Sequence, residues 1–206
     1  MEQSAPALLL KLGVCLGLVV GLAAPATAQT TPRAEASGGY QFLSLSSGGE
    51  SEPFPKGWYV DLAGNLNQTW GVVFEVGGNY KSQTETATVG RITATATADI
   101  KLHEFMGGVR AASRKNPTVA PFVQVLAGAM TGSASFSVTS GAGNTTLFSA
   151  SGAESGTNFA VQFGGGVTVG RRDKAGVRIG ADYVRIFATD EGANLFRFAA
   201  GINIPF

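Results

Sequence analysis

The sequence predicts an all-β fold, an eight-stranded antiparallel up-and-down β-barrel, and three observations support this prediction. Apolar residues alternate with polar or small residues in segment after segment, and a period of two is the period of a β-strand. Long and short connections between these segments alternate along the chain. The chain also ends on such a segment, whose apolar row is Phe196, Phe198, Ala200, Ile202, Ile204 and Phe206.

Eight segments are predicted as strands, and no segment of ten or more residues has a convincing helical period. Each is close to the roughly ten residues that a tilted membrane strand requires, and an even number of strands is typical of single-chain bacterial barrels. In order along the chain, the predicted strands cover residues 34–45, 57–67, 70–83, 99–112, 119–135, 158–171, 176–188 and 195–206.

Alternation of side-chain type supports the second, third, sixth and seventh of these strands most clearly. One row of side chains is apolar, and the opposite row is small or polar, rich in Gly and poor in charge. Such a row would make a poor solvated surface but suits the lining of a barrel interior. The apolar rows are Trp58, Val60, Leu62 and Leu66; Trp70, Val72, Phe74, Val76 and Tyr80; Phe159, Val161, Phe163, Gly165, Val167 and Val169; and Val177, Ile179, Ala181 and Tyr183.

Aromatic residues near the strand ends are typical of the girdles that flank the lipid band of a membrane barrel. A scatter of ordinary core aromatics is the alternative interpretation. The residues concerned are Tyr40, Trp58, Trp70, Tyr80 and Tyr183.

The fourth predicted strand changes phase along its length. Ile100 and Leu102 lie on one row, whereas Phe105 and Val109 lie on the other. Either a bulge shifts the register, or the upper part of the strand stands above the lipid. These alternatives leave open the facing of Lys101, His103 and Glu104.

The connections predict two different rims. Short turns on one rim and longer loops on the other are the asymmetry of an outer-membrane barrel, with the short turns in the periplasm. The longest loops, which include residues 84–97 and 137–156, are rich in Ser, Thr, Gly and Ala. We expect them to stay mobile because they bury little apolar area. They form either a surface for adhesion or a hydrophilic cap.

The N-terminal segment predicts export. Residues 12–24 are a continuous apolar run, and residues 26–28 offer the small-x-small pattern of a signal-peptide cleavage site. The run is shorter than the roughly 20 residues that a spanning helix needs. We therefore expect residues 1–28 to be a cleaved signal peptide and residues 29–206 to form one domain. Cys15, the only cysteine, lies in the signal, so the mature domain should contain no disulfide.

Composition excludes several functional classes. The formal net charge of +1 argues against a nucleic-acid partner. After residue 28 no apolar run is long enough for a spanning helix, so a membrane protein of this sequence must be a closed transmembrane barrel. The glycine cluster at residues 164–166 precedes a strand-like run instead of a helix, which argues against a dinucleotide site. No group of residues has metal-ligand spacing, so we expect neither a metal nor a cofactor.

These features together resemble the small outer-membrane β-barrel family of the OmpA/OmpX type, often described as generic porin-family β-barrel domains. The resemblance implies a monomer in the outer membrane of a Gram-negative bacterium, in contact with outer-membrane lipid. It also implies assembly by the barrel-insertion machinery, with the terminal aromatic residue as the assembly signal. The residues that carry the resemblance are Gly164-Gly165-Gly166, Asp182-Tyr183 and Phe206.

Charged residues on the inward rows predict a polar network in the interior. Eight strands enclose a space just wide enough for side chains. An unpaired charge there would cost several kcal/mol, so we expect the charges to pair. A structural plug is favoured over an ion gate. The predicted network consists of Glu35, Asp61, Glu75, Arg110, Arg178, Asp182 and Arg197.

The predicted function is that of an integral outer-membrane barrel with a structural or surface-interaction role, and an extracellular ligand or surface remains unidentified. Two alternatives stay open: a soluble periplasmic ligand-binding barrel and a lipid-modifying outer-membrane enzyme. An enzyme of the second kind would use His103, the only histidine. However, no Ser or Asp lies at a recognisable motif spacing from it for a nucleophile, base and orienting group. We therefore predict no catalytic residue.

Overall fold

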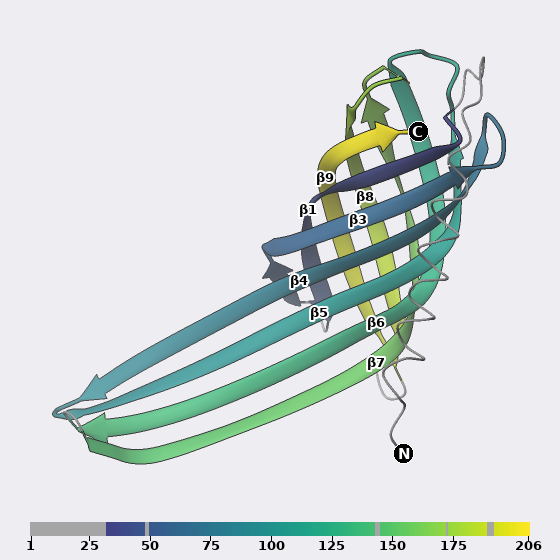
Figure 1. Ribbon diagram of the computed structural model, residues 1–206. Helices are drawn as coiled ribbons and strands as arrows, with labels where there is room; N and C mark the ends of the chain where they lie inside the picture. The colour runs from purple at the N-terminus through teal and green to yellow at the C-terminus, as the bar shows by residue number, and fades with distance from the viewer. Residues whose placement is uncertain (1–31, 48–49, 143–144, 172, 189–191) are drawn as a thin grey trace, which may run out of the picture.

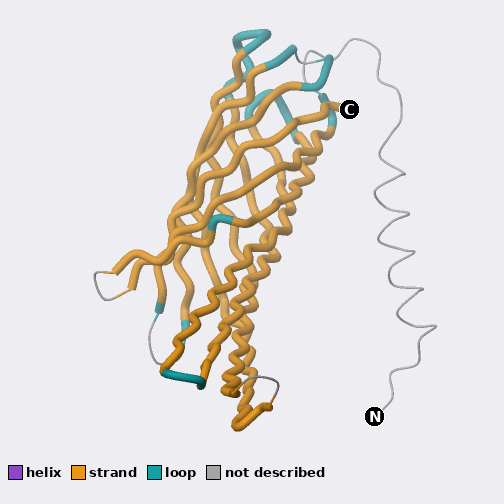
Figure 2. Tube along the Cα trace, turned by 90° about the vertical axis from the view of Figure 1, so that its left-hand side faces the viewer, coloured by secondary structure: helices purple, strands orange, loops and turns teal. Residues whose placement is uncertain are grey.

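The described chain forms a closed barrel with a sheet that projects from one rim (Figures 1 and 2). The computed structural model describes residues 32–47, 50–142, 145–171, 173–188 and 192–206. The predicted signal peptide lies outside the described residues. Within these ranges no helix has the length and apolar character needed to cross a membrane.

Eight of the nine strands in the described residues form a ring in which every neighbour is antiparallel. β1 pairs with β9, from Glu35 opposite Pro205 to Ser46 opposite Asn194, and this pairing closes the ring. The predicted eight-stranded antiparallel barrel is therefore confirmed. The strands are β1 (Ala34–Ser47), β2 (Glu50–Phe54), β3 (Lys56–Asn65), β4 (Trp70–Val89), β5 (Ile92–Ala112), β6 (Val119–Ala142), β7 (Thr145–Val169), β8 (Gly176–Phe187) and β9 (Ala193–Pro205).

The short strand β2 was not predicted. It lies in the connection that was expected to be a loop, and it pairs with residues 43–47 of β1, beyond the end of the β1–β3 ladder at Tyr40. Phe54 at its end is only 2% exposed and joins the apolar cluster of the interior. A buried aromatic residue thus fixes this connection against the barrel.

Side chains alternate between the inside and the outside of the ring, because successive residues of a strand point to opposite faces. In β4, Val72 and Phe74 are 51% and 55% exposed, whereas Val73 and Glu75 are each 1% exposed. In this part of β4 the large apolar side chains therefore point away from the barrel, and the carboxylate of Glu75 points into it. This arrangement is the reverse of that in a soluble protein, where the apolar face is buried.

β5 is regular, so the bulge, one of the two alternatives left open for this strand, is absent. Its ladder with β4 runs without interruption from Ala111 opposite Trp70 to Ile92 opposite Val89. Ile100 and Leu102 lie on the inward row, where they pack against the apolar cluster near the projecting end of the barrel.

The same register assigns the three residues of β5 whose facing was open. Lys101 and His103 lie on the outward row with Phe105, which is 52% exposed. Glu104 lies on the inward row and is buried.

The two longest predicted loops are strands, which corrects the expectation that residues 84–97 and 137–156 are mobile loops. β4 pairs with β5 as far as Val89, and β6 pairs with β7 as far as Ala142. β5 and β6 also stay paired over this length. We call the resulting four-stranded extension, residues 82–89, 92–99, 135–142 and 145–153, the projecting sheet (Figure 1). Thr is frequent in it, and β-branched residues favour strands.

Apolar side chains fill a large part of the barrel interior. A well-packed interior leaves few voids, so deletion of a buried side chain leaves a cavity. The buried cluster consists of Leu43, Phe54, Ala63, Val73, Met106, Leu126, Met130, Ala160, Val184 and Leu195, with Leu45, Ile100, Leu102 and Ile186 packed against it.

Neighbouring substitutions in β6 should differ sharply in their effect on stability. Leu126 is fully buried, and Leu126→Ala should lower the free energy of unfolding by about 2–5 kcal/mol because it leaves a cavity. Val125 points outward, so Val125→Ala should cost less than about 1 kcal/mol. Urea unfolding of the refolded protein in detergent measures both values, and similar losses would contradict the facing of β6.

Candidate functional site: the charged interior

Arg197 lies at the centre of the interior and binds three carboxylates from three other strands. Its Nη1 donates to Glu75 Oε1 at 2.6 Å and to Glu104 Oε1 at 3.1 Å, and its Nη2 donates to Asp182 Oδ2 at 2.7 Å. Nη1 also donates to Gln41 Oε1 at 3.1 Å. All five side chains are buried. The guanidinium therefore connects β9 to β1, β4, β5 and β8 across the barrel.

A second ionic group lies nearer the rim with the short turns. Arg178 donates to Glu35 Oε2 at 2.6 Å and to Asp61 Oδ1 at 3.1 Å. Arg110 reaches Asp61 Oδ2 at 3.3 Å. Both guanidinium groups lie against the ring of Phe122, 4.8 Å and 5.2 Å from its centroid. The aromatic ring holds two like charges side by side through cation–π contacts while the carboxylates offset them.

Gln124 joins the two ionic groups. Its Oε1 accepts from Arg110 Nε at 3.0 Å, and its Nε2 donates to Asp182 Oδ1 at 3.0 Å. All seven residues of the predicted network therefore belong to one connected system of ion pairs and hydrogen bonds.

Glycines in the inward rows make room for the large polar side chains. A Cβ at Gly164 would lie 1.8 Å from Oδ1 of Asp182, which faces it on β8. A Cβ at Gly77 would lie 2.4 Å from Glu104 Oε1. The interior is narrow, so a charged side chain on one strand requires a glycine at the adjacent position of the neighbouring strand.

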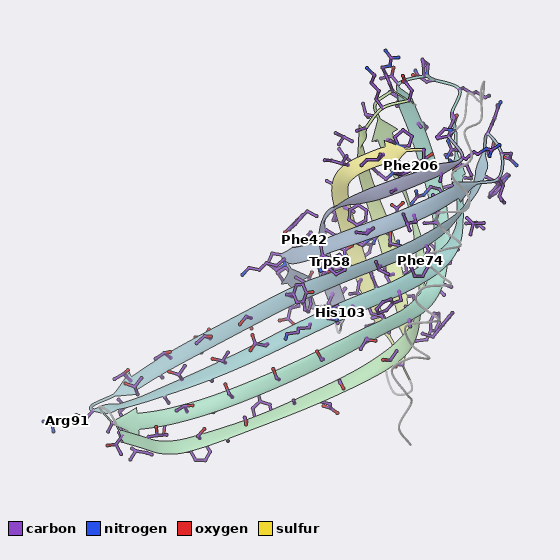
Figure 3. All side chains as sticks on the ribbon, in the orientation of Figure 1. Phe42, Trp58, Phe74, Arg91, His103 and Phe206 are labelled. Carbon is purple, nitrogen blue, oxygen red and sulfur yellow. The ribbon has the colours of Figure 1, made fainter. Side chains whose placement is uncertain are left out.

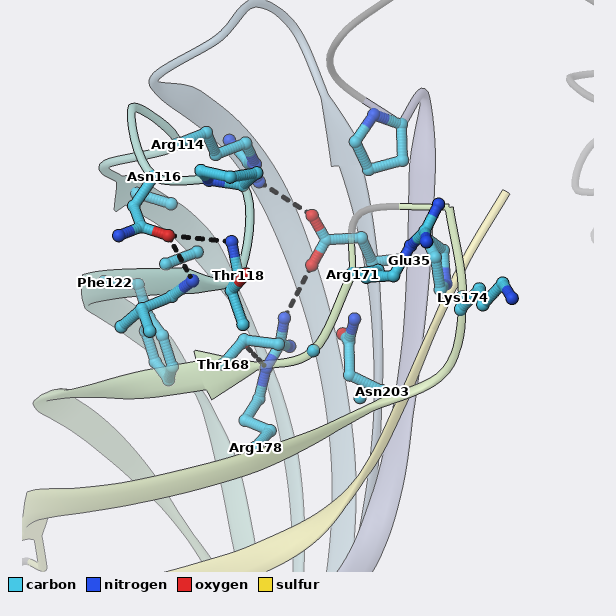
Figure 4. A pocket seen from close by; sticks show the side chains of 18 of the residues that line it. Glu35, Arg114, Asn116, Thr118, Phe122, Thr168, Arg171, Lys174, Arg178 and Asn203 are labelled. Atoms are coloured by element: carbon cyan, nitrogen blue, oxygen red, sulfur yellow. Dashed lines mark hydrogen bonds and ion pairs between the residues drawn. The ribbon is translucent and has the colours of Figure 1, made fainter.

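The network opens onto a small cavity at the rim with the short turns (Figure 4). Figure 4 shows Glu35 between Arg114 and Arg178, and Arg114 Nη2 donates to Glu35 Oε1 at 2.8 Å. The cavity has a volume of about 40 Å³, enough for a few water molecules. On the turn below it, a hydrogen bond from Arg171 lowers the pKa of the Asp173 carboxyl.

Several members of the network could not be predicted from the sequence. Glu104 was left unassigned because the apolar residues of its strand change phase. The neutral amides of Gln41, Gln124 and Gln162 carry no charge signal. Glu104 Oε2 and Gln162 Oε1 are buried without a hydrogen-bond partner among the described residues. The charge balance is also uneven, since three carboxylates meet one guanidinium around Arg197.

The groups of the network are carboxylates, guanidinium groups and amides that form most of their hydrogen bonds with one another. In the described part of the chain no group of His, Cys, Asp and Glu could hold a metal ion. His103 lies on the outward face and contacts the hydroxyl of Tyr80, so it is not part of this network.

Comparisons with known proteins agree with the fold. A family model described as "Outer membrane protein beta-barrel domain" matches residues 14–204. The solved structure of Ail, the attachment invasion locus protein of Yersinia pestis, in complex with the heparin analogue sucrose octasulfate, is similar with a TM-score of 0.55. It is 19% identical, and the match covers 84% of this chain and 99% of that chain. Neisserial surface protein A matches at a TM-score of 0.49 and 10% identity, over 84% of this chain and 96% of that chain. No curated protein matches the sequence.

Removal of the central guanidinium should destabilise the barrel strongly. Arg197→Met leaves Glu75, Glu104 and Asp182 buried without their cation, and breaking such a group costs about 3–5 kcal/mol. Arg171→Met, on an exposed turn, should leave the urea midpoint unchanged.

A second variant distinguishes lost charge pairing from lost packing. Adding Glu75→Gln to Arg197→Met removes one of the orphaned charges and should recover part of the lost stability in the same urea titration. If Arg197→Met alone unfolds at the wild-type urea concentration, the guanidinium does not hold the interior together.

Proposed function

The chain belongs to the outer membrane β-barrel family, and on that premise we propose that it is an integral outer-membrane protein. Its interior is closed by its own side chains, and its projecting sheet is a surface for interactions outside the cell. Export by a cleaved signal peptide at residues 1–28 and assembly through the terminal Phe206 belong to this proposal. At the C-terminus, Phe206 N donates to Ala34 O at 2.8 Å, and Arg33 N donates to Phe206 O at 2.9 Å.

The observation that carries the membrane placement is the outward apolar belt of the ring. Such a continuous surface would promote aggregation in water, whereas lipid is its natural solvent. The ionic network and the apolar cluster occupy the interior, which argues against a soluble periplasmic binding barrel. Exposed members of the belt include Val60, Leu62, Val72, Phe74, Phe105, Val125, Phe163, Ile179, Phe198 and Ile202.

Two sets of side chains support the proposal of a closed interior. The ionic network and the apolar cluster interleave along the strands, since Val73 of the cluster lies nearer the short turns than Glu75 of the network. Passage of a solute would require both sets to come apart. A hydrated ion would also have to pass the apolar side chains, where an unpaired charge is costly.

The projecting sheet supports an interaction role because its two faces differ and its edges are open. Thr84, Thr86 and Thr88 face Thr97, Thr95 and Thr93 across the β4–β5 ladder, with hydroxyl oxygens 3.2, 3.3 and 3.1 Å apart. This hydroxyl face continues the outward row of the ring. The opposite face carries more apolar side chains, among them Ala94, Ala96, Phe136, Val138 and Phe148, together with Glu85 opposite Ala96.

The open edges belong to the outer strands of the projecting sheet. The β3–β4 ladder ends at Tyr80, and the β7–β8 ladder ends at Phe159. Beyond these points one edge of β4 and one edge of β7 have no strand partner among the described residues. Unpaired backbone groups of this kind can accept an added strand from another molecule.

We further propose that the protein is not a lipid-modifying enzyme. A catalytic His103 would need a nucleophile and an orienting carboxylate within hydrogen-bond reach. Its hydrogen-bond contact in the described residues is the Tyr80 hydroxyl at 3.4 Å.

Charged substitutions on one face of β4 should separate the lipid band from the projecting sheet. Val76 and Thr86 lie on the same outward row and have similar shapes. Val76→Arg should cost roughly 2–4 kcal/mol because it places a charge in lipid. Thr86→Arg should assemble normally because it lies in water. The heat-modifiable gel shift of membrane-extracted protein reports assembly, and equal tolerance of both substitutions would contradict the membrane placement.

Electrical recording tests the closed interior. The purified barrel, added to a planar bilayer, should give no stable porin-like current steps, because the ionic network and the apolar cluster block the bore. A general porin under identical conditions is the positive control. Large, long-lived steps from the folded barrel would show that the interior opens.

A further inference from the structure

Five outward-facing side chains gather where the apolar belt ends and the projecting sheet begins. We propose that they bind the phosphate group of a phosphorylated glycolipid in the outer leaflet. The inference rests on the membrane placement proposed above. We call the group the phosphate platform, and it consists of Lys56, Trp58, Tyr80, Lys101 and His103.

Two adjacent rows across β3, β4 and β5 build the platform. In the first row, Tyr80 lies opposite Lys56 on one side and Lys101 on the other. In the second row, Gly78 lies between Trp58 and His103 in the same way. Strand pairing therefore brings Lys56 and Lys101, which are far apart in the sequence, to either side of Tyr80.

The three aromatic side chains of the platform hold one another in place. Trp58 Nε1 donates to the Tyr80 hydroxyl at 3.2 Å, and this hydroxyl lies 3.4 Å from His103 Nε2. The Tyr80 and His103 rings meet edge to face, with centroids 5.7 Å apart. A platform fixed in this way loses little conformational entropy when it binds a ligand.

Gly78 permits this arrangement. A Cβ at this position would lie 3.0 Å from Trp58 Nε1, 3.1 Å from the Tyr80 hydroxyl and 3.2 Å from His103 Cδ2. The glycine is buried although it lies on the outward row, because the three side chains close over it.

The two lysines of the platform carry charge that the protein does not neutralise. Among the described residues, no carboxylate forms an ion pair with Lys56 or Lys101, although nearby Lys81 pairs with Glu52 at 2.5 Å. Both ammonium groups are on exposed residues. An ammonium is a compact donor that suits a phosphate oxygen.

The height of the platform matches that of lipid headgroups. On the β4 row, apolar Phe74 and Val76 precede it, and Ser82 and Thr84 follow it. Figure 3 shows Trp58 and His103 between Phe74 and the projecting sheet. Aromatic and basic residues at such a boundary lie at the membrane–water interface, where lysine reaches headgroups. The rim with the long hairpins is the extracellular one, so the leaflet is the outer one.

Hydroxyl groups extend the platform and favour a sugar-linked phosphate. Ser133 lies opposite Lys101, and Thr131 lies opposite His103. Thr131 in turn shares a hydrogen bond with Thr157 at 2.9 Å between their hydroxyl oxygens. These groups can donate to and accept from sugar hydroxyls next to the phosphate.

Trp58 provides a direct readout of binding. The chain has two tryptophans, so Trp70→Phe leaves Trp58 as the single emitter. Folded protein in neutral phosphatidylcholine nanodiscs is titrated with bis-phosphorylated lipid A, with chemically dephosphorylated lipid A, and with phosphatidylglycerol. We expect a saturable change in Trp58 emission with phosphorylated lipid A only.

Removal of the two charges should weaken this binding by about thirtyfold, because each lysine near an anionic surface contributes about the same favourable free energy of binding. The variant is Lys56→Gln with Lys101→Gln, and the matched control is Lys115→Gln with Lys174→Gln on the opposite rim. Unchanged affinity in the first variant, or equal binding of dephosphorylated lipid A, would overturn the proposal. Equal binding of phosphatidylglycerol would overturn the glycolipid as the source of the phosphate.

A second substitution tests the platform without changing its charge. Tyr80→Phe removes the hydroxyl that contacts both Trp58 and His103, and it should weaken binding while the heat-modifiable gel shift stays normal. Wild-type affinity in Tyr80→Phe would show that the aromatic arrangement has no part in binding. A failure of the membrane placement would instead appear as equal tolerance of Val76→Arg and Thr86→Arg in the gel-shift comparison, so the two failures are distinguishable.

Discussion

Closure of the sheet by the pairing of β1 with β9 is the constraint on which the rest of the structure depends. Once the first and last strands pair, the ring has no free edge, and every side chain in it points either inward or outward. An eight-stranded ring also has an interior only as wide as the side chains that fill it. The outward belt, the inward network and the glycines beside large polar residues all follow from this geometry.

In the interior, one buried guanidinium is shared by several buried carboxylates. A guanidinium presents five donors in a fixed plane, which allows Arg197 to serve Glu75, Glu104 and Asp182 together. A lysine could not reach three strands with the same geometry. Toward the projecting sheet the interior is mainly apolar, and Phe54 from β2 packs into it. A single narrow lumen thus contains charged groups that fix the strands and apolar side chains that exclude water.

The ring could be predicted from the sequence because each of its strands has one row of side chains facing outward and one facing the interior. This arrangement imposes a period of two. The projecting sheet could not, since its Thr, Ser, Ala and Gly residues carry little apolar contrast. The repeated Thr at residues 93, 95 and 97 was the available signal, because alternating β-branched residues favour a strand. The facing of Glu104 could not be predicted for another reason. Ile100 and Leu102 point inward although they are apolar, so polarity does not distinguish inward from outward residues in this part of β5.

Single-cysteine labelling along β4 in intact cells tests the central claim, a filled barrel in the membrane with a sheet standing in water. Cys15, the only cysteine, lies in the proposed cleaved signal peptide, so each variant carries a single thiol in the mature domain. With a water-soluble maleimide, Thr86→Cys should react quickly. Outward Phe74→Cys should be protected by lipid, and inward Val73→Cys by packing. Rapid labelling at position 73 would contradict a filled interior, and rapid labelling at position 74 would contradict the membrane placement.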